Sequence, residues 1–347
     1  MTNLDYCKST LRRVSRTFAL NIAFLRGDLH KSILTAYLFC RIADTIEDTI
    51  FRDSSTQKAL LDSYKNIFDS GSVTVEKTLS WIADYHAAAK TINSTDDHNL
   101  VSNAERVIEL YLTLPDPYQE AVNECIHEMA TGMLCTLERK ENQPSKLFFS
   151  KTIEDLNKYC YYVAGTVGVL LSRLFFVHSQ AITRHIWENL KDRAVSFGLG
   201  LQLTNIIKDC WVDQKRGWCY IPEELVRQSG IDPDDFFLPQ HRLKAQLTIN
   251  ELIQRAANHL DEALTYTLTI PRREVRIRLF CLLPLLLAIQ TLIEAKDNLK
   301  LFTDDKVKIS RLQVKKTIRN AFFFCWSNQA ISNYYNSFRK QLQQQSA

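Results

Sequence analysis

Glycine and proline are scarce in this chain, with nine and eight among 347 residues. Hairpins and sandwiches need turn residues about every eight to twelve positions, so this scarcity argues against an all-β fold. Apolar residues make up 46% of the chain, which is enough for a substantial core. The composition therefore predicts long helices packed around that core.

The nine cysteines occur singly, and none forms a Cys-x-x-Cys pair or a Cys/His spacing typical of zinc. An odd, scattered set on apolar segments indicates free buried thiols in a reducing compartment. The N-terminal residues lack an apolar signal region, and no transit peptide is evident. We therefore expect a cytoplasmic protein without a signal peptide.

Long hydrophobic runs and dense basic tracts are also lacking. The longest apolar run, Leu279 to Ile289, has eleven residues and includes Pro284. About 20 residues are needed to span a bilayer, so this run predicts a buried core helix and not a transmembrane anchor. The net charge of +4 is small. We expect no nucleic-acid partner, and nothing in the sequence indicates an obligate protein partner.

Apolar periodicity and the positions of proline predict helices along the whole chain. We expect them at 5–26, interrupted by Ser15-Arg16-Thr17, and at 30–50, 58–92, 100–113, 116–138, 152–178, 181–214, 240–268, 272–296 and 312–342. The segment 93–97 is expected to be a loop. The polar segment 297–311 is expected to be a mobile flap, and 340–347 a frayed end. No repeat or linker divides the chain, so we predict a single all-α domain over 1–347.

A polar column runs along the stretch from Gln202 to Asp213. Residues four apart lie one above the other on a helix, about 6 Å apart along the axis, so Asn205, Asp209 and Asp213 share one face. Gln202, three residues before Asn205, joins this face. The surrounding positions are apolar, and acids and amides on an apolar helix need water, cations or metal as partners.

A second acidic stripe lies far upstream, where Asp44 and Asp48 have the same spacing and Arg41 precedes them by one helical turn. Taken singly, such a pair more often belongs to a solvated helix face. Two pairs on apolar helices, each beside basic residues, favour magnesium, which takes one or two carboxylates plus phosphate oxygens and water. The metal would neutralise a diphosphate leaving group. We therefore expect the two stripes to face each other.

Four motifs, in this order, resemble the squalene/phytoene synthase family over nearly the whole chain. They are Ser15-Arg-Thr-Phe-Ala19, Arg41-x-x-Asp44-x-x-Glu47-Asp48, Tyr159-Cys-Tyr-Tyr-Val-Ala-Gly-Thr-Val-Gly168 and Gln202-x-x-Asn205-x-x-x-Asp209-x-x-x-Asp213. Two further stretches resemble the squalene synthase branch: Leu171-Ser-Arg-Leu-Phe175 and Phe280-Cys-x-x-Pro284-x-x-x-Ala288-x-x-Thr291-Leu. The resemblance implies the all-helical isoprenoid synthase bundle with one central active-site cavity.

The same resemblance implies a reaction. Members of the family join two prenyl diphosphates head to head through a cyclopropyl intermediate, and squalene synthases then reduce it with a hydride from NADPH. We therefore expect a farnesyl-diphosphate farnesyltransferase that makes squalene through presqualene diphosphate, with Mg²⁺ (Mn²⁺ as an alternative) and NADPH as cofactors.

Two alternatives remain open. A synthase that needs no reductant would stop at presqualene diphosphate or form dehydrosqualene or phytoene. An alternative of another class is a non-catalytic helical module that binds prenyl lipids or supports assembly. Loss of an acidic residue would favour that module, and all four aspartates are present.

The resemblance also implies roles for individual residues. Metal ligation and catalysis are implied for Asp44, Asp48, Asp209 and Asp213. Substrate binding is implied for Arg16, Thr17, Phe18, Arg41, Val163, Gly168, Gln202, Asn205 and Phe280. Cofactor binding is implied for Asn205, Lys308 and Arg311. Tyr159 would assist ionisation and proton removal. Gly165 and Gly168 leave room for either a prenyl tail or a neighbouring helix, and the sequence does not decide between them.

Three positions depart from the family pattern. Ser310 stands where an arginine is usual in the segment that holds the cofactor phosphates, and Arg311 follows it. Trp218 stands where an arginine is usual five residues after Asp213, and Val212 replaces an acidic residue. We expect altered phosphate contacts there. No Gly-x-Gly-x-x-Gly motif is present, so NADPH would bind outside a Rossmann unit.

An amphipathic substrate and an oily product predict a peripheral association with a membrane surface. The candidate contacts are the amphipathic faces of 272–296 and 312–342.

Overall fold

The computed structural model describes residues 1–51, 53–69, 73–91, 95–143 and 147–344, which form two compact units. The first unit is Met1–Asn142 with Val169–Gln180, and the second is Gln143–Gly168 with Ala181–Ala347. Helices dominate both units, which confirms the predicted all-α class. Two short strand pairs add to them: β1 (Ile50–Phe51) with β2 (Ala89–Thr91), and β3 (Phe148–Phe149) with β4 (Trp218–Cys219). The single domain over 1–347 stays a prediction.

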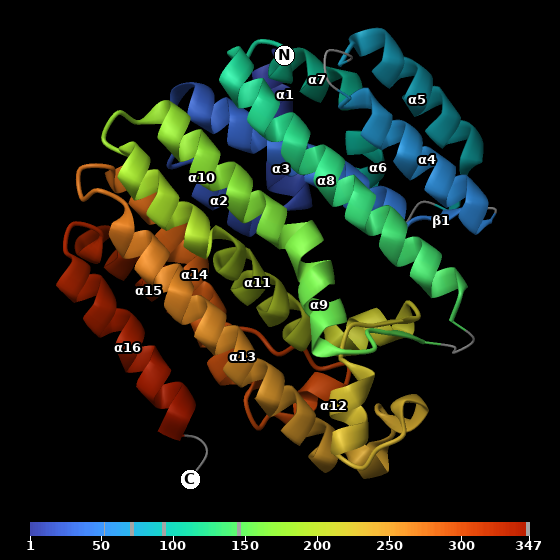
Figure 1. The fold of residues 1–347 in the computed structure, drawn as a ribbon, viewed down its shortest axis with the longest axis vertical. Helices are drawn as coiled ribbons and strands as arrows, with labels where there is room; N and C mark the ends of the chain where they lie inside the picture. The colour runs from blue at the N-terminus through green and yellow to red at the C-terminus, as the bar shows by residue number, and fades with distance from the viewer. Residues whose placement is uncertain (52, 70–72, 92–94, 144–146, 345–347) are drawn as a thin grey trace. The chain divides into compact units, whose positions relative to one another are not determined.

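In the first unit, helix α3 has an apolar side that its neighbours cover. The helices are α1 Asn3–Val14, α2 Arg16–Ile22, α3 Gly27–Asp48, α4 Ser54–Ile67, α5 Val75–Ala88, α6 Thr95–Val101, α7 Ala104–Tyr111, α8 Asp116–Glu141 and the later part of α10 Thr166–His178. Leu34, Leu38 and Ile42 recur on α3 at helical spacing, and each is fully buried. The long helix α8 packs against α3 and α4 (Figure 1).

The interruption predicted at Ser15-Arg16-Thr17 is a break between two helices. Ser15 has extended geometry (φ −157°, ψ 103°), and its hydroxyl accepts a hydrogen bond from the Phe18 amide at 3.4 Å, which caps α2. Arg16 and Thr17 begin α2 and are exposed. The break therefore places both side chains at the surface of the first unit.

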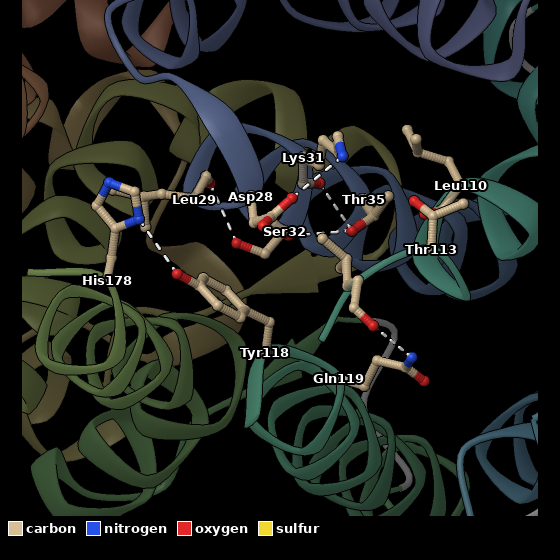
Figure 2. Close-up of polar contacts among 11 residues, drawn as sticks. Asp28, Leu29, Lys31, Ser32, Thr35, Leu110, Thr113, Tyr118, Gln119 and His178 are labelled. Carbon is tan, nitrogen blue, oxygen red and sulfur yellow. Dashed lines mark hydrogen bonds and ion pairs between the residues drawn. The ribbon is translucent and has the colours of Figure 1, made fainter. Parts of the chain in front are cut away.

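A polar contact joins the start of α8 to the end of α10 within the first unit, and further polar contacts lie within the start of α3 nearby (Figure 2). The Tyr118 hydroxyl lies 3.1 Å from His178 Nδ1, and Gln119 donates to the Leu114 carbonyl at 2.8 Å. Lys31 and Asp28 pair at 3.1 Å on the first turn of α3. Burial raises the pKa of Tyr118, and the charge of Asp28 adds to this. The phenol therefore stays protonated and can donate to His178.

In the second unit, the long helices α11 and α13 pack against each other (Figure 1). Its helices are α9 Ile153–Cys160, α11 Arg184–Lys215, α12 Glu223–Gln228, α13 Arg242–Thr269, α14 Val275–Ala295, α15 Arg311–Phe324 and α16 Asn328–Gln344. Short turns are η1 Tyr161–Gly165, which is π-helical, and η2 Pro233–Asp235, η3 Pro239–His241 and η4 Leu299–Phe302, which are 3-10.

The apolar run Leu279–Ile289 lies in α14, where most of its side chains are buried, so the predicted core helix is confirmed. By length and composition, two helical stretches of the described chain could cross a membrane: Val275–Ala295 and Ile153–His178. In Val275–Ala295, 78% of the most apolar 18-residue window is buried inside the structure, as in a core helix. In Ile153–His178, 44% of the corresponding window is buried. These two stretches are weak evidence for a membrane span.

Three predicted helices are each divided in two. The stretch 58–92 contains α4 and α5, 100–113 is broken before α7, and 312–342 contains α15 and α16. The last break has a visible cause. The fully buried Arg278 donates to the Cys325 carbonyl at 2.8 Å and to the Asn328 side chain at 2.7 Å. It thereby satisfies a carbonyl group that the end of α15 leaves without a helical partner.

The expected loop and flexible segments have mixed outcomes. Of the loop expected at 93–97, residues 93–94 lie outside the described residues, and α6 begins at Thr95, so 95–97 are helical. Within 297–311, Leu301 and Phe302 are buried against the second unit; the mobility of this segment stays a prediction. Helix α16 runs to Gln344, and 345–347 of the expected frayed end lie outside the described residues.

Candidate active site

The acidic end of α3 is the first part of the candidate site. Asp44 and Asp48 lie one turn apart on α3, and Arg41 lies one turn before them. Burial raises the pKa of Asp44 to about 7, and the charges of Asp48 and Asp97 add to this while Arg41 opposes it. A nearby cation would favour the charged form of such a carboxyl group. This end of α3 is therefore suited to a cation.

Two residues that sequence reasoning missed complete this end of α3. Arg41 Nε and Nη2 donate to the two carboxylate oxygens of Asp97 at 2.9 Å each, a bidentate pair. Lys140 of α8 is half-buried, and burial lowers its pKa while the charges of Glu47 and Asp48 oppose that shift. Spacing could not reveal either residue, since Asp97 is 56 positions from Arg41 and Lys140 lies on another helix.

The stretch Ser15–Phe18 lies on α2 and its cap, near the acidic end of α3. The ring of Phe18 stands 5.0 Å from the ring of Tyr37 on α3. Burial raises the pKa of Tyr37, a hydrogen bond from Ser15 opposes the shift, and the charge of Asp44 adds to it. Tyr37 therefore lies between the start of α2 and the acidic residues, and the first unit brings these two predicted segments together.

The polar column on α11 is the part of the candidate site in the second unit. Helix α11 is continuous from Arg184 to Lys215, so its spacing puts Gln202, Asn205, Asp209 and Asp213 on one face. The Asp209 carboxylate pairs with Lys208 at 2.9 Å, and Asp213 pairs with Arg216 at 2.7 Å. The Asp213 side chain is 13% exposed and the Asp209 side chain 45%. Asp209 thus has a cation from its own helix, and Asp213 has one from the residue that caps the end of the helix.

Trp218, one of the departures from the family pattern, is buried in β4, which pairs in parallel with β3. Its ring lies parallel to the Tyr220 ring, with centroids 5.7 Å apart and planes at 12°. Tyr220 in turn stacks on Tyr159, with centroids 4.4 Å apart and planes at 19°. Trp218 therefore belongs to an aromatic stack that ends on Tyr159. Sequence reasoning missed Tyr220, which directly follows β4.

Gly168 and Gly198 allow the chain near η1 to approach α11 closely. A β-carbon at Gly168 would lie 2.1 Å from the Ala194 carbonyl oxygen, and one at Gly198 would lie 2.3 Å from the Ala164 carbonyl oxygen. Backbone atoms fill the space that a side chain would need at either glycine. The close approach of the neighbouring helix therefore explains why residue 168 is a glycine. At Gly165 a β-carbon would instead meet the Tyr161 side chain, at 2.9 Å.

We expect Gly168→Ala and Gly198→Ala each to lower the free energy of unfolding by about 2 kcal/mol or more, because overpacking against backbone forces the helices apart. The gain in helix propensity from glycine to alanine, about 1 kcal/mol, is smaller and does not offset this. Urea unfolding followed by circular dichroism measures the change. Gly165→Ala is the matched control, with a smaller loss expected because side chains can shift. Equal stability of all three variants would contradict the close approach.

The other predicted residues of the second unit have ordinary surroundings. Val163 is half-buried in η1, and Phe280 is buried in α14. Lys308 and Arg311 are exposed. Ser310 begins α15 with a capping box: its hydroxyl accepts from the Gln313 amide at 3.2 Å, and its own amide donates to the Gln313 side chain at 2.7 Å. The departure at position 310 thus has a helix-capping role.

The donor set in each unit fits magnesium bound with a diphosphate. In the described parts of both units, no group of three His, Cys, Asp or Glu side chains is placed to hold a metal by itself. Magnesium usually takes only one or two protein carboxylates and completes its octahedron with phosphate oxygens and water. Asp44 and Asp48 can supply these two carboxylates. A bound ion would also offset the repulsion from the like charges that help to raise the pKa of Asp44.

Comparison with known proteins places the chain in a family. The family model for squalene/phytoene synthase matches residues 11–313. The chain belongs to the squalene/phytoene synthase family. The predicted family is confirmed, and the prediction of a squalene synthase-type prenyltransferase is confirmed at the level of the family.

Individual relatives agree with this. Squalene synthase 1 of Arabidopsis thaliana is 28% identical over 90% of this chain and 70% of its own length. The squalene synthase of Schizosaccharomyces pombe is 30% identical over 91% of this chain and 64% of its own length. The chain thus spans about two thirds of the length of these relatives. A solved structure of TcSQS with the ligand E5700 superposes with a TM-score of 0.82, covering 98% of this chain and 91% of that one at 23% identity, and shares the fold.

Proposed function

We propose that the protein condenses two molecules of farnesyl diphosphate head to head, through presqualene diphosphate, and reduces the product to squalene with NADPH. The observation that carries the proposal is the acidic pair at i and i+4 on each of two helices, α3 and α11, in a chain of this family. The reaction releases two diphosphates, and each acidic pair supplies the carboxylates that one magnesium–diphosphate needs.

The four aspartates, Asp44, Asp48, Asp209 and Asp213, would hold Mg²⁺. When bound, the metal neutralises the diphosphate as the carbon–oxygen bond breaks. For Asp209 and Asp213 this requires an exchange of partners, because Lys208 and Arg216 occupy their carboxylates. Both cations are partly exposed and can turn toward phosphate oxygens. They thereby compensate for the arginine that Trp218 replaces.

Basic and polar residues of the first unit would bind diphosphate. Arg41 presents a planar fork that fits phosphate as well as it fits Asp97, so substrate would take the place of the Asp97 carboxylate. Arg16 adds a guanidinium and Thr17 a hydroxyl from the exposed start of α2, with Phe18 packed behind them.

In the second unit, Tyr159 would assist ionisation and proton removal. Its ring is held against Tyr220, which fixes the direction of the hydroxyl. Gln202 and Asn205 would contact the reacting carbons, while Val163 and Phe280 would contact the prenyl chains. Gly168 would support the site by letting α10 approach α11 closely. An aromatic face such as that of Phe280 stabilises a cationic intermediate.

The reductive step would use Asn205, Lys308 and Arg311 to hold NADPH, which supplies the hydride. Lys308 and Arg311 are exposed just before and at the start of α15, where cations can meet the cofactor phosphates. Ser310 caps the helix and supplies no charge, so the cofactor would be held by fewer cations than the family pattern provides. This departure is what favours the second candidate, a synthase that releases presqualene diphosphate, dehydrosqualene or phytoene without a reductant.

Product analysis distinguishes the two candidates. We expect purified protein incubated with farnesyl diphosphate, Mg²⁺ and NADPH to form squalene, detected by mass spectrometry, and to accumulate presqualene diphosphate when NADPH is left out. Replacing Mg²⁺ by EDTA is expected to stop both. Release of diphosphate without squalene under any reductant would contradict the reductive step, and the same product with and without NADPH would favour the second candidate.

Because the substrate is amphipathic and the product is an oil, the protein would also associate peripherally with a membrane surface.

A further inference from the structure

The net positive charge of this protein arises at one end of the sequence. From Lys306 to Ala347 there are eight lysines and arginines and no aspartate or glutamate. This segment carries a charge of +8, while the rest of the chain, with 35 basic and 39 acidic residues, carries −4. Helices α15 and α16 account for most of the segment, so the second unit has a cationic surface there.

Exposed aromatic side chains gather on the same segment. Phe322 is 46% exposed, Phe323 73% and Trp326 60%. Among the side chains that the structure describes, these are the exposed phenylalanines and tryptophans of the whole chain. The other large exposed apolar residues are aliphatic and scattered, which is normal for a surface. Three aromatics within five positions are not scattered.

The cations and the aromatics lie on one face of α15 and in the turn that follows it, a surface called here the α15 face. It comprises Leu312, Lys315, Lys316, Arg319, Phe322, Phe323 and Trp326. On α15, which ends at Phe324, the first six positions fall within an arc of about 120° at about 100° per residue. Trp326 follows in the turn after the helix, and all seven side chains are exposed.

The opposite side of α15 is fixed in the second unit. Thr317 and Ala321 are buried, and the Thr317 hydroxyl lies 2.9 Å from the Gln290 side-chain nitrogen on α14. Helices α14, α15 and α16 pack against one another (Figure 1). The helix therefore cannot rotate to bury its aromatics, and the α15 face points to solvent.

We propose that the α15 face docks the protein on an anionic lipid surface. Lysine and arginine near a membrane interact with anionic headgroups, and aromatic side chains are favoured at the boundary between headgroups and acyl chains. An interfacial helix combines these two features on the side that it turns to lipid. The α15 face has both, and the segment from position 306 onward itself adds no acid that would repel anionic lipid. This inference deepens the peripheral membrane association proposed above.

Vesicle co-sedimentation tests the docking without any substrate. We expect the protein to sediment with vesicles that contain about 30% phosphatidylserine and not with pure phosphatidylcholine, and we expect salt to weaken the binding. Two triple variants, Phe322→Ser/Phe323→Ser/Trp326→Ser and Lys315→Gln/Lys316→Gln/Arg319→Gln, are each expected to lower vesicle affinity about tenfold or more.

Matched controls come from the same unit. Leu243→Ser/Leu247→Ser removes two exposed apolar side chains of α13, and Lys151→Gln/Arg184→Gln/Lys191→Gln removes three exposed cations; both are expected to leave vesicle binding unchanged. Trp326 is the exposed member of the five tryptophans, so vesicles should shift its fluorescence to the blue, and Trp326→Phe should abolish that shift.

Several outcomes would overturn the proposal. One is vesicle binding that the α15 variants leave intact, and another is no binding to anionic vesicles at all. A third is self-association of the wild type without lipid, measured by sedimentation velocity, that the α15 variants do not show. The α15 face would then join two copies of the chain. The assay for squalene formation is run in detergent with soluble substrate, so failure of docking and failure of the proposed reaction can be told apart.

Discussion

Asp209→Asn is expected to lower the turnover of farnesyl diphosphate about a thousandfold or more while the protein stays folded. The carboxylate is one of the two that α11 offers to magnesium, and stabilisation of the leaving diphosphate by a metal contributes several kcal/mol to the barrier. The amide keeps the size of the side chain and removes its charge. Diphosphate release under saturating Mg²⁺ measures turnover, and circular dichroism with thermal unfolding measures the fold.

Asp192→Asn is the control for this experiment. Asp192 is also on α11 but is exposed and lies away from the 202–213 column, so turnover should stay within about twofold of the wild type. Unchanged turnover in Asp209→Asn would contradict a metal role for the column. Absence of turnover in the wild type itself, with prenyl lipid still bound, would instead support a non-catalytic binding module.

The acidic stripe of α3 and the polar column of α11 could be predicted because they depend on local geometry alone. An aspartate pair four residues apart shares a face wherever the chain is helical, and α3 and α11 are helical through both pairs. The charged residues around the α3 aspartates could not be predicted, because tertiary packing brings them there. Asp97 meets Arg41 only because α6 packs on α3, and Lys140 reaches Glu47 and Asp48 only because α8 does. Such contacts are set by packing, and sequence periodicity carries no record of them.

Helix ends also differ in whether local sequence or tertiary packing determines them. The break at Ser15 is local, since a serine hydroxyl competes for backbone hydrogen bonds and caps the next helix. The break between α15 and α16 depends on Arg278, which lies on α14 and reaches the Cys325 carbonyl across the unit. A continuous apolar pattern over 312–342 therefore predicts one helix where the structure has two. Whether the two acidic stripes face each other stays a prediction.

The departures from the family pattern have physical roles of their own. Ser310 caps α15, and Trp218 carries an aromatic stack to Tyr159. A missing arginine alone suggests only a weaker phosphate contact. The structure adds what the tryptophan does in its place, because β4 buries position 218, and an arginine there would need a partner for its charge.

Trp218→Ala is expected to lower the free energy of unfolding by about 3 to 5 kcal/mol, the usual cost of truncating a large buried aromatic side chain. Trp218 is 6% exposed and stacks on Tyr220, so its loss leaves a cavity under the stack. Urea unfolding monitored by far-ultraviolet circular dichroism measures the change. Trp326→Ala is the matched control, because Trp326 is 60% exposed and should cost no more than about 0.5 kcal/mol.

Trp218→Phe, in the same experiment, tests whether any aromatic ring at position 218 can replace the packing of the indole. A phenyl ring keeps much of the contact with Tyr220, so this variant should recover most of the stability that Trp218→Ala loses. Catalytic effects should follow the same order, since Tyr159 is held by Tyr220 and Tyr220 by residue 218. If Trp218→Ala were as stable as Trp326→Ala, the stack would not be a packing element. If Trp218→Phe restored stability but not turnover, the indole would act on the reaction through more than its support of Tyr159.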